Sequence, residues 1–136
     1  MRLEQPKPED IINEEIRYRY VNNSRNSYTR HYLVKDGDRE VGFLSLDFSP
    51  LDEPLVIYEV FVPRNLRKRG LGTMLLRAAE ETAREHGYEW ILVVPMTMDS
   101  VFSQADIEAW YRVNGYEGWE DHSFGGLRKR VAHSSA

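Results

Sequence analysis

The segment Leu55–Val62 constrains the fold of this chain more than any other part of the sequence. Its β-branched and aromatic residues favour a β-strand. Apolar side chains would stand on both faces of this strand, so we expect a central strand that is covered on both sides. Glu59 is its one charged residue. Strict alternation places Glu59 on the same face as Ile57 and Phe61.

A helix follows this strand after a short loop. Apolar residues at helical spacing predict an amphipathic helix over residues 71–86. On its solvent face, Arg77 and Glu81 have the i, i+4 spacing of an ion pair. Glu80 and Arg84 have the same spacing, so we expect a second pair there.

The loop between the strand and the helix combines cations with glycines. A helix start leaves backbone N–H groups without partners and carries about half a positive charge from the helix dipole. Such an end is a natural site for a phosphate, and Gly70 and Gly72 would let a bulky anion approach the backbone. The cations beside it are Arg64, Arg67, Lys68 and Arg69. We expect a diphosphate cradle built mainly from backbone, the alternative being a solvated basic loop.

The remaining pattern completes an α/β layered domain. A single domain is expected, with residues 1–8 and 132–136 as loose ends. Helical spacing, turn signals and apolar runs predict a helix within residues 9–20, a hairpin of strands 28–34 and 41–48, a strand at 90–94, a helix at 104–113, and short strands within 116–119 and 124–131. This order of elements predicts a mixed sheet with helices packed on it.

The composition excludes several classes of protein. The 136 residues carry a net charge of −4, whereas a general nucleic-acid-binding protein is normally basic. No apolar run approaches the roughly 18 residues of a membrane span, and the first residues lack the apolar stretch of a signal peptide. Cysteine is absent, which excludes disulfides and thiolate metal sites. We therefore expect a cytoplasmic protein with no nucleic acid, membrane or metal among its partners.

Two motifs, at matching positions in this order of elements, carry a resemblance to a known family. Residues 67–72 (RKRGLG) match the Arg/Gln-x-x-Gly-x-Gly/Ala signature of the GNAT superfamily of acyl-CoA-dependent N-acetyltransferases. Residues 111–116 resemble the family's Tyr-x-x-x-Gly-Phe ending, with Tyr116 in place of phenylalanine. The resemblance covers about residues 30–120. It implies a mixed, mostly antiparallel central sheet flanked by helices.

The resemblance also implies a role for individual residues. The amides of the signature loop would hold the pyrophosphate of acetyl-CoA, and the preceding strand would splay from its neighbour and bond the pantetheine arm. Tyr111 would be the general acid for the departing thiolate. The cofactor-binding residues implied are Val60, Phe61, Val62, Arg67, Lys68, Arg69, Gly70, Leu71, Gly72 and Thr73.

The general base follows less directly from the sequence. An amine acceptor is mostly protonated at neutral pH and must lose a proton before it attacks the thioester. Glu59 is the first candidate, because burial in an apolar strand would raise its pKa toward the useful range. Its alternative role is a structural carboxylate paired with an arginine. His122, Asp106 or a chain of water molecules are further candidates.

Two functions remain open at this point. The first is an N-acetyltransferase that moves acetyl from acetyl-CoA to a primary amine of a small molecule or peptide by direct attack. The second is a non-catalytic acyl-CoA-binding module or partner subunit with the same fold. Acidic residues around the central strand favour a cationic acceptor, although an ordinary acidic hairpin explains them equally well: Asp47, Asp52, Glu53 and Glu59. A homodimer is among the oligomeric states left open.

Overall fold

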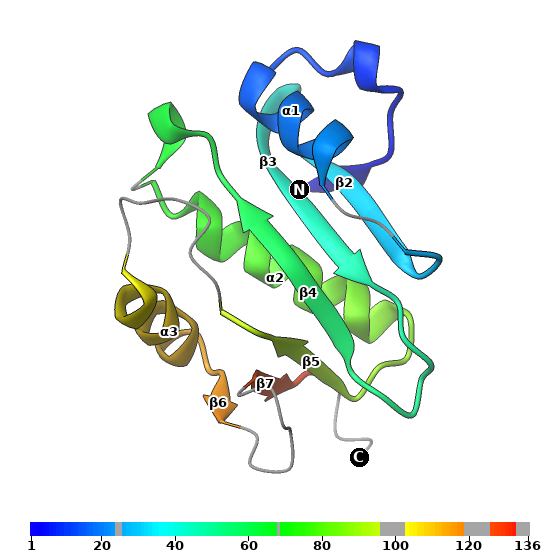
Figure 1. Cartoon of the computed structure of the whole chain (residues 1–136), viewed down its shortest axis with the longest axis vertical. Helices are drawn as coiled ribbons and strands as arrows, with labels where there is room; N and C mark the ends of the chain where they lie inside the picture. Colours follow the sequence, from blue (N-terminus) through cyan, green and yellow to red (C-terminus); the bar gives the residue numbers. More distant parts are fainter. Residues whose placement is uncertain (24–25, 68, 96–102, 119–125, 133–136) are drawn as a thin grey trace.

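The centre of the molecule is a seven-stranded sheet in the order β1-β2-β3-β4-β5-β7-β6 (Figure 1). A computed structural model describes residues 1–23, 26–67, 69–95, 103–118 and 126–132. Neighbouring strands are antiparallel except for β4 and β5, which run parallel. The predicted mixed, mostly antiparallel sheet flanked by helices is therefore confirmed.

Twelve elements make up the described chain. The strands are β1 (Arg2–Glu4), β2 (Thr29–Asp36), β3 (Arg39–Asp47), β4 (Leu55–Phe61), β5 (Trp90–Val93), β6 (Glu117–Gly118) and β7 (Leu127–Arg130). The helices are α1 (Glu14–Asn22), α2 (Leu71–Glu85) and α3 (Gln104–Val113), with short 3₁₀ turns η1 (Pro8–Asp10) and η2 (Arg64–Leu66). Within the described residues, no helix has the length and apolar content needed to cross a bilayer.

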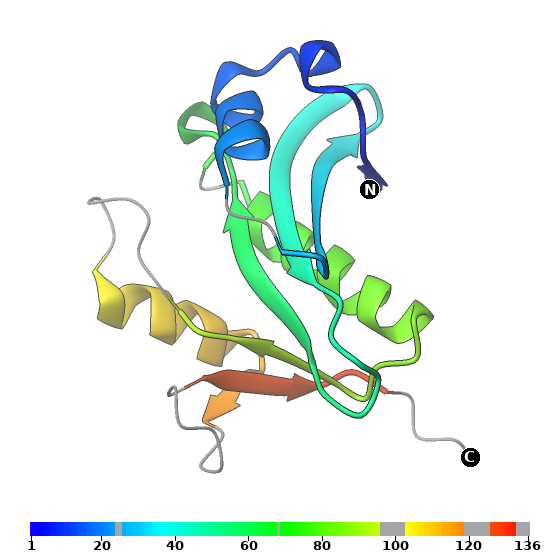
Figure 2. The ribbon, with the colours of Figure 1, turned by 45° about the vertical axis from the view of Figure 1, so that its right-hand side comes forward.

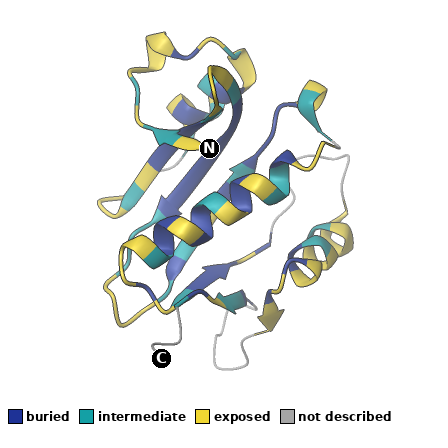
Figure 3. Cartoon of the chain, turned by 180° about the vertical axis from the view of Figure 1, so that it is seen from behind, coloured by how far each residue is buried: buried dark blue, intermediate teal, exposed yellow. Residues whose placement is uncertain are grey.

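Helices cover the two faces of the sheet unequally. α2 crosses one face, where it buries Leu75, Leu76 and Ala79 in the main apolar cluster, and Figure 3 shows it lying over the strands with its outer side exposed. α1 packs on the opposite face and buries Ile16 and Tyr20 in a second, smaller cluster. Figure 2 shows α1 and α2 on either side of the curved sheet. Both faces of the central strand are thus covered at its end nearest α1, as predicted.

The N-terminal region differs from the prediction. Residues 1–8 were expected to be loose, but β1 pairs with β2, with Leu3 opposite Val34. The predicted helix within residues 9–20 begins later than expected, because the side chain of Asn13 caps its first turn by accepting a hydrogen bond from Ile16 N–H at 3.0 Å. Three residues are too few to give an alternating pattern, so β1 depends on its partner strand.

A β-bulge interrupts the central strand and changes which side chains share a face. Ser45 of β3 pairs with Glu59 and Leu46 pairs with Ile57, so Tyr58 is the extra residue. A bulge of one residue reverses the alternation beyond it. Ile57 packs in the α2 cluster, whereas Phe61 packs in the α1 cluster. The prediction that Ile57, Glu59 and Phe61 share one face is therefore wrong.

Candidate active site

β4 and β5 separate where the site would lie. Their pairing begins at Leu55 and Ile91 and stops at Ile57 and Val93, although β4 continues to Phe61 (Figure 1). Among the described residues, the part of β4 after the bulge pairs with β3 alone. Its other edge therefore offers backbone groups to a ligand in an extended conformation.

The first turn of α2 lies just beyond the end of β4 and has no side-chain cap. Its N-cap residue is Gly70, which has a left-handed φ of 75° and no side chain to accept a hydrogen bond. Asn13 caps α1, and Ser103 with Asp106 forms a capping box at the start of α3. Among the three described α-helices, α2 alone begins with its amides and dipole left for an external acceptor.

The cations of the loop have different surroundings. Arg67 is half-buried, and its Nε donates to the carbonyl oxygen of Val62 at 3.0 Å, which ties the loop back onto the end of β4. Its guanidinium also lies 5.8 Å from the ring centre of Phe61. Arg69 is exposed beside Gly70, whereas Lys68 lies outside the described residues. Arg67 thus holds the conformation of the loop, whereas Arg69 lies at its surface.

Gly72 lies beside a ring of α3 that the sequence did not place there. A Cβ atom added to Gly72 would lie 3.4 Å from the indole of Trp110 on α3. This distance is an ordinary van der Waals contact, so the expectation that Gly72 lets an anion approach the backbone stays a prediction. Trp110 in turn lies 4.8 Å from the ring of Tyr111, centre to centre. The indole therefore joins the first turn of α2 to the predicted acid.

Tyr111 is buried, with a relative exposure of 6 %. Burial raises the pKa of its phenol well above the usual value, and the negative charge of Glu59 raises this pKa further. The two predicted catalytic residues are therefore near enough to interact electrostatically. A phenol with a raised pKa keeps its proton at neutral pH and can donate it.

Glu59 is enclosed by α1. Its Oε1 accepts a short hydrogen bond from Arg19, and its Oε2 accepts from the side chain of Asn23 at 2.6 Å. Burial raises the pKa of Glu59, while the Arg19 charge and both hydrogen bonds oppose that rise. Arg19 also stacks 4.0 Å over the ring centre of Phe61. This surrounding is that of a carboxylate paired with an arginine, the alternative that the sequence left open.

The other candidates are not brought to this site. Asp106 is exposed and closes the capping box of α3. Asp52 and Glu53 lie in the turn before β4, about 20 Å of strand from its opposite end. His122 and residues 96–102 lie outside the described residues. Within the described ranges, no group of three or more His, Asp or Glu side chains is placed to hold a metal ion.

Sequence reasoning missed a buried polar cluster beside the site. Glu80 was predicted on the solvent face of α2, paired with Arg84, but its relative exposure is only 1 %. It instead accepts from Arg77, Lys129 and the hydroxyl of Tyr116. The one signal in the sequence was tyrosine where the family motif has phenylalanine, since a buried hydroxyl requires a partner.

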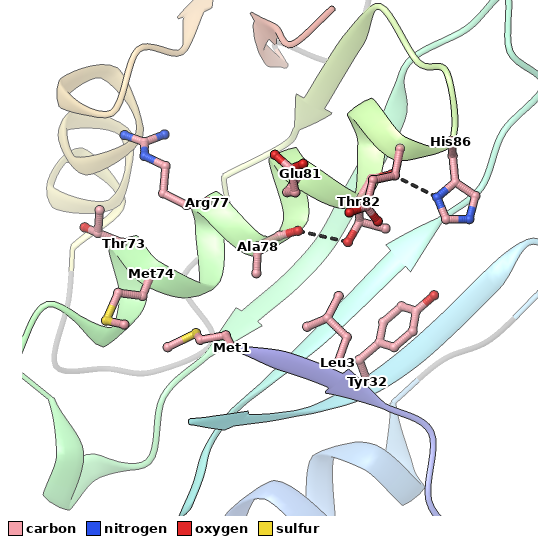
Figure 4. Close-up of a pocket in the computed structure, with 11 residues that line it drawn as sticks. Met1, Leu3, Tyr32, Thr73, Met74, Arg77, Ala78, Glu81, Thr82 and His86 are labelled. Carbon is pink, nitrogen blue, oxygen red and sulfur yellow. Dashed lines mark hydrogen bonds between the residues drawn. The ribbon is translucent and has the colours of Figure 1, made fainter. Parts of the chain in front are cut away.

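A groove of about 740 Å³ runs along the other side of α2, between this helix and β1 with β2 (Figure 4). Met1, Leu3 and Tyr32 line one wall, and Met74 and Ala78 are on the helix wall. The groove adjoins the first turn of α2 only at the end that is lined by Thr73 and Met74. The groove is therefore distinct from the gap between β4 and β5.

A family model joins this geometry to known proteins. The model of the acetyltransferase (GNAT) family matches residues 2–122. The chain belongs to the GNAT acetyltransferase family. An open edge between two parallel strands and an uncapped helix start therefore lie where this GNAT chain carries the family signature. No curated protein sequence matches the chain.

Solved structures similar to this GNAT chain share its fold at low sequence identity. An IAA acetyltransferase from Bacillus cereus is 22 % identical, with a TM-score of 0.60 over 94 % of this chain and 97 % of that one. A GNAT family acetyltransferase from Elizabethkingia anophelis, solved with acetyl-CoA bound, is 16 % identical, with a TM-score of 0.61 over 93 % and 92 %. The AtaT–AtaR complex bound to DNA includes a chain 15 % identical, with a TM-score of 0.65 over 88 % and 81 %.

Proposed function

We propose that this protein is an N-acetyltransferase that moves the acetyl group of acetyl-CoA to a primary amine. The observation that carries the proposal is the uncapped start of α2 beside the unpaired edge of β4. Family membership supports acetyl transfer in general. The roles proposed for individual residues rest on the resemblance of two motifs to the family, and the surroundings of those residues in this chain support them.

The amides at the start of α2 would hold the pyrophosphate, and acetyl-CoA would supply a thioester as the acetyl donor. Gly70 leaves these amides uncapped, and Arg69 adds a positive charge at the surface. The open edge of β4 after Tyr58 would bond the pantetheine arm through its backbone. The Val62 carbonyl already accepts from Arg67, so the part we assign to Val62 is its N–H, directed at the developing oxyanion.

Tyr111 would act as the general acid. As the amine nitrogen bonds to the acetyl carbon, the carbon–sulfur bond breaks and the thiolate accepts the phenolic proton. The raised pKa of Tyr111 keeps that proton in place at neutral pH. The amine would release its own proton to water, and the Tyr111 phenolate would take a proton from water before the next turnover. Arg19 and Asn23 already occupy the two oxygens of Glu59, which supports a structural role for this carboxylate over a base.

A thiol-release assay with acetyl-CoA and a panel of amines, polyamines, aminoglycosides and peptides tests the function. Tyr111→Phe should lower kcat by roughly 10²–10⁴-fold, as expected for loss of a positioned proton donor, and should leave the Kd for CoA nearly unchanged. The wild-type rate should rise as the amine deprotonates. It should not fall near pH 10, where an ordinary tyrosine ionises, because the pKa of Tyr111 is raised. An unchanged kcat in Tyr111→Phe would remove the assigned acid.

A second candidate is a non-catalytic acyl-CoA-binding module. The engagement of Glu59 by Arg19 favours it, because the described site then offers no unengaged carboxylate as a base. In that case calorimetry would detect CoA binding while no amine in the panel releases thiol. Glu59→Gln separates the roles of Glu59, since loss of a base lowers kcat by two or more orders of magnitude, whereas loss of a structural partner mainly lowers the melting temperature.

A further inference from the structure

The polar cluster around Glu80 lies outside the transfer site but is connected to it. We call Glu80, Arg77, Asn114, Tyr116 and Lys129 the Glu80 cluster. Arg77 Nη1 donates to both carboxylate oxygens, at 2.6 and 2.8 Å, and Lys129 Nζ donates to Oε1 at 3.1 Å. The hydroxyl of Tyr116 donates to Oε2 at 2.9 Å. Two cations and a phenol thus satisfy one buried carboxylate, as burial of such a charge requires.

The cluster fixes the C-terminal end of α3 to the middle of α2. Arg77 Nη2 donates to the side-chain oxygen of Asn114 at 3.1 Å, and Lys129 Nζ donates to its carbonyl at 3.2 Å. The side-chain amide of Asn114 donates to the carbonyl of Trp110 at 2.8 Å. Directional bonds of this kind set the angle and register between two helices, which apolar contact alone does not.

Tyr116 connects the cluster to Tyr111 in two ways. Its backbone N–H donates to the carbonyl of Tyr111 at 3.1 Å. Its ring meets the ring of Tyr111 edge-on, with the centres 5.5 Å apart and the planes at 75°. Both the main chain and the ring of Tyr111 therefore touch a residue whose hydroxyl is held by Glu80.

We propose that Glu80 is a positioning residue that acts through Tyr116 to hold the Tyr111 phenol at a set distance from the first turn of α2. Glu80 and Thr73 are on the same helix, seven residues or about 10 Å apart. One rigid element, α2, would thereby position both the amides that hold the pyrophosphate and the phenol of Tyr111. The inference rests on the proposed function, because it gives Tyr111 the part of the acid.

The test compares Glu80→Gln and Tyr116→Phe with Glu81→Gln. Glu81 is the next residue of α2 and lies on the surface paired with Arg84, so its variant is a matched control. In Glu80→Gln the new amide would present N–H groups to the cations, and Tyr116→Phe would keep the ring while removing the hydroxyl. We expect kcat to fall about tenfold in both cluster variants, with the KM for acetyl-CoA and the Kd for CoA unchanged, since small misplacement of a catalytic group is costly.

A double-mutant comparison separates positioning from general destabilisation. In the Tyr111→Phe background, Glu80→Gln should lower kcat by less than twofold, because the group it positions has been removed. A further tenfold loss in that background would overturn the proposal and leave the acid role of Tyr111 intact. An unchanged kcat in Tyr111→Phe itself would instead contradict the proposed function and the positioning role together.

A second measurement does not depend on turnover. In protein labelled with ¹³C-tyrosine, the ring resonance of Tyr111 is identified by its loss in Tyr111→Phe. That resonance should shift or broaden in Glu80→Gln without ligand and stay unchanged in Glu81→Gln. An unchanged Tyr111 resonance in Glu80→Gln would overturn the proposal even if the variant is less stable.

Discussion

The helices α2 and α3 begin in opposite ways. α3 starts at Ser103, whose side chain accepts from the amide of Asp106 at 3.1 Å while Asp106 accepts in return from the Ser103 amide. α2 starts at Gly70, in a left-handed conformation, with no side chain to take up its first amides. The first start is complete within the chain and the second requires an outside acceptor, so the difference separates a structural helix end from a binding one.

Of the variants that test this contrast, Gly72→Trp should have the largest effect, which is a loss of CoA affinity at the start of α2. The new side chain would start 3.4 Å from Trp110 and fill the space at the uncapped turn. We expect the Kd for CoA, measured by calorimetry, to rise by at least about 100-fold, or roughly 2.7 kcal/mol. Met74→Trp is the matched control, because Met74 faces the groove on the other side of α2. If both variants bound CoA equally well, the pyrophosphate would not lie at this helix start.

Thr73→Asp should change stability and affinity in opposite directions. A carboxylate in the first turn of α2 would satisfy the free amides and the dipole, raising the free energy of unfolding by about 0.3–1 kcal/mol. The same charge would repel a pyrophosphate, so CoA should bind about tenfold more weakly, or roughly 1.4 kcal/mol. Urea unfolding and calorimetry give the two quantities, and Thr73→Asn supplies the uncharged control. Unaltered affinity in the aspartate variant would count against the cradle.

Ser103→Ala should lower the stability of the protein without changing its affinity for CoA. Loss of the capping box should lower the free energy of unfolding by about 1 kcal/mol. The affinity for CoA should not change, because this end of α3 has no part in the cradle. A parallel loss of CoA affinity would mean that the two helix starts are not independent.

Arg69→Gln should give the smallest effect. Arg69 is exposed at the loop surface, where charges interact weakly and are screened by salt. We expect CoA to bind a few-fold more weakly at low ionic strength, with the difference disappearing in molar salt. Arg39→Gln, in the β2–β3 hairpin, serves as control. A loss that persisted at high salt would indicate a direct bond from Arg69 to the ligand.

Local sequence signals predicted most of the fold. The helix at 104–113 and the strand at 55–62 match α3 and β4 closely, because periodicity and turn residues act over short distances. The short strand β1 was missed because it depends on pairing with β2. The bulge at Tyr58 was missed for the same reason, since it is defined by the register with β3.

The candidate site was predictable in its backbone and less so in its side chains. The glycine-containing loop and the position of Tyr111 follow from two motifs. The partner of Glu59 lies 40 residues earlier, on α1, and no local pattern connects it with β4. Glu80 sits at the border of the apolar stripe of α2, so helical periodicity alone placed it in solvent. Its burial follows from the packing of α3 and β7.

The bulge in β4 makes Tyr58 a residue that the pairing with β3 does not use. Tyr58 is half exposed, so substitutions there should be tolerated. Deleting it would give simple alternation from Leu55 onward with the other side chains kept on their present faces, because Ile57 and Glu59 would then pair one to one with Leu46 and Ser45. Val60 would stay on the side of α2, and Glu59 would stay on the side of Arg19 and α1. A deletion at this one position would therefore remove the local bend of the strand and leave the two sides of the sheet as they are.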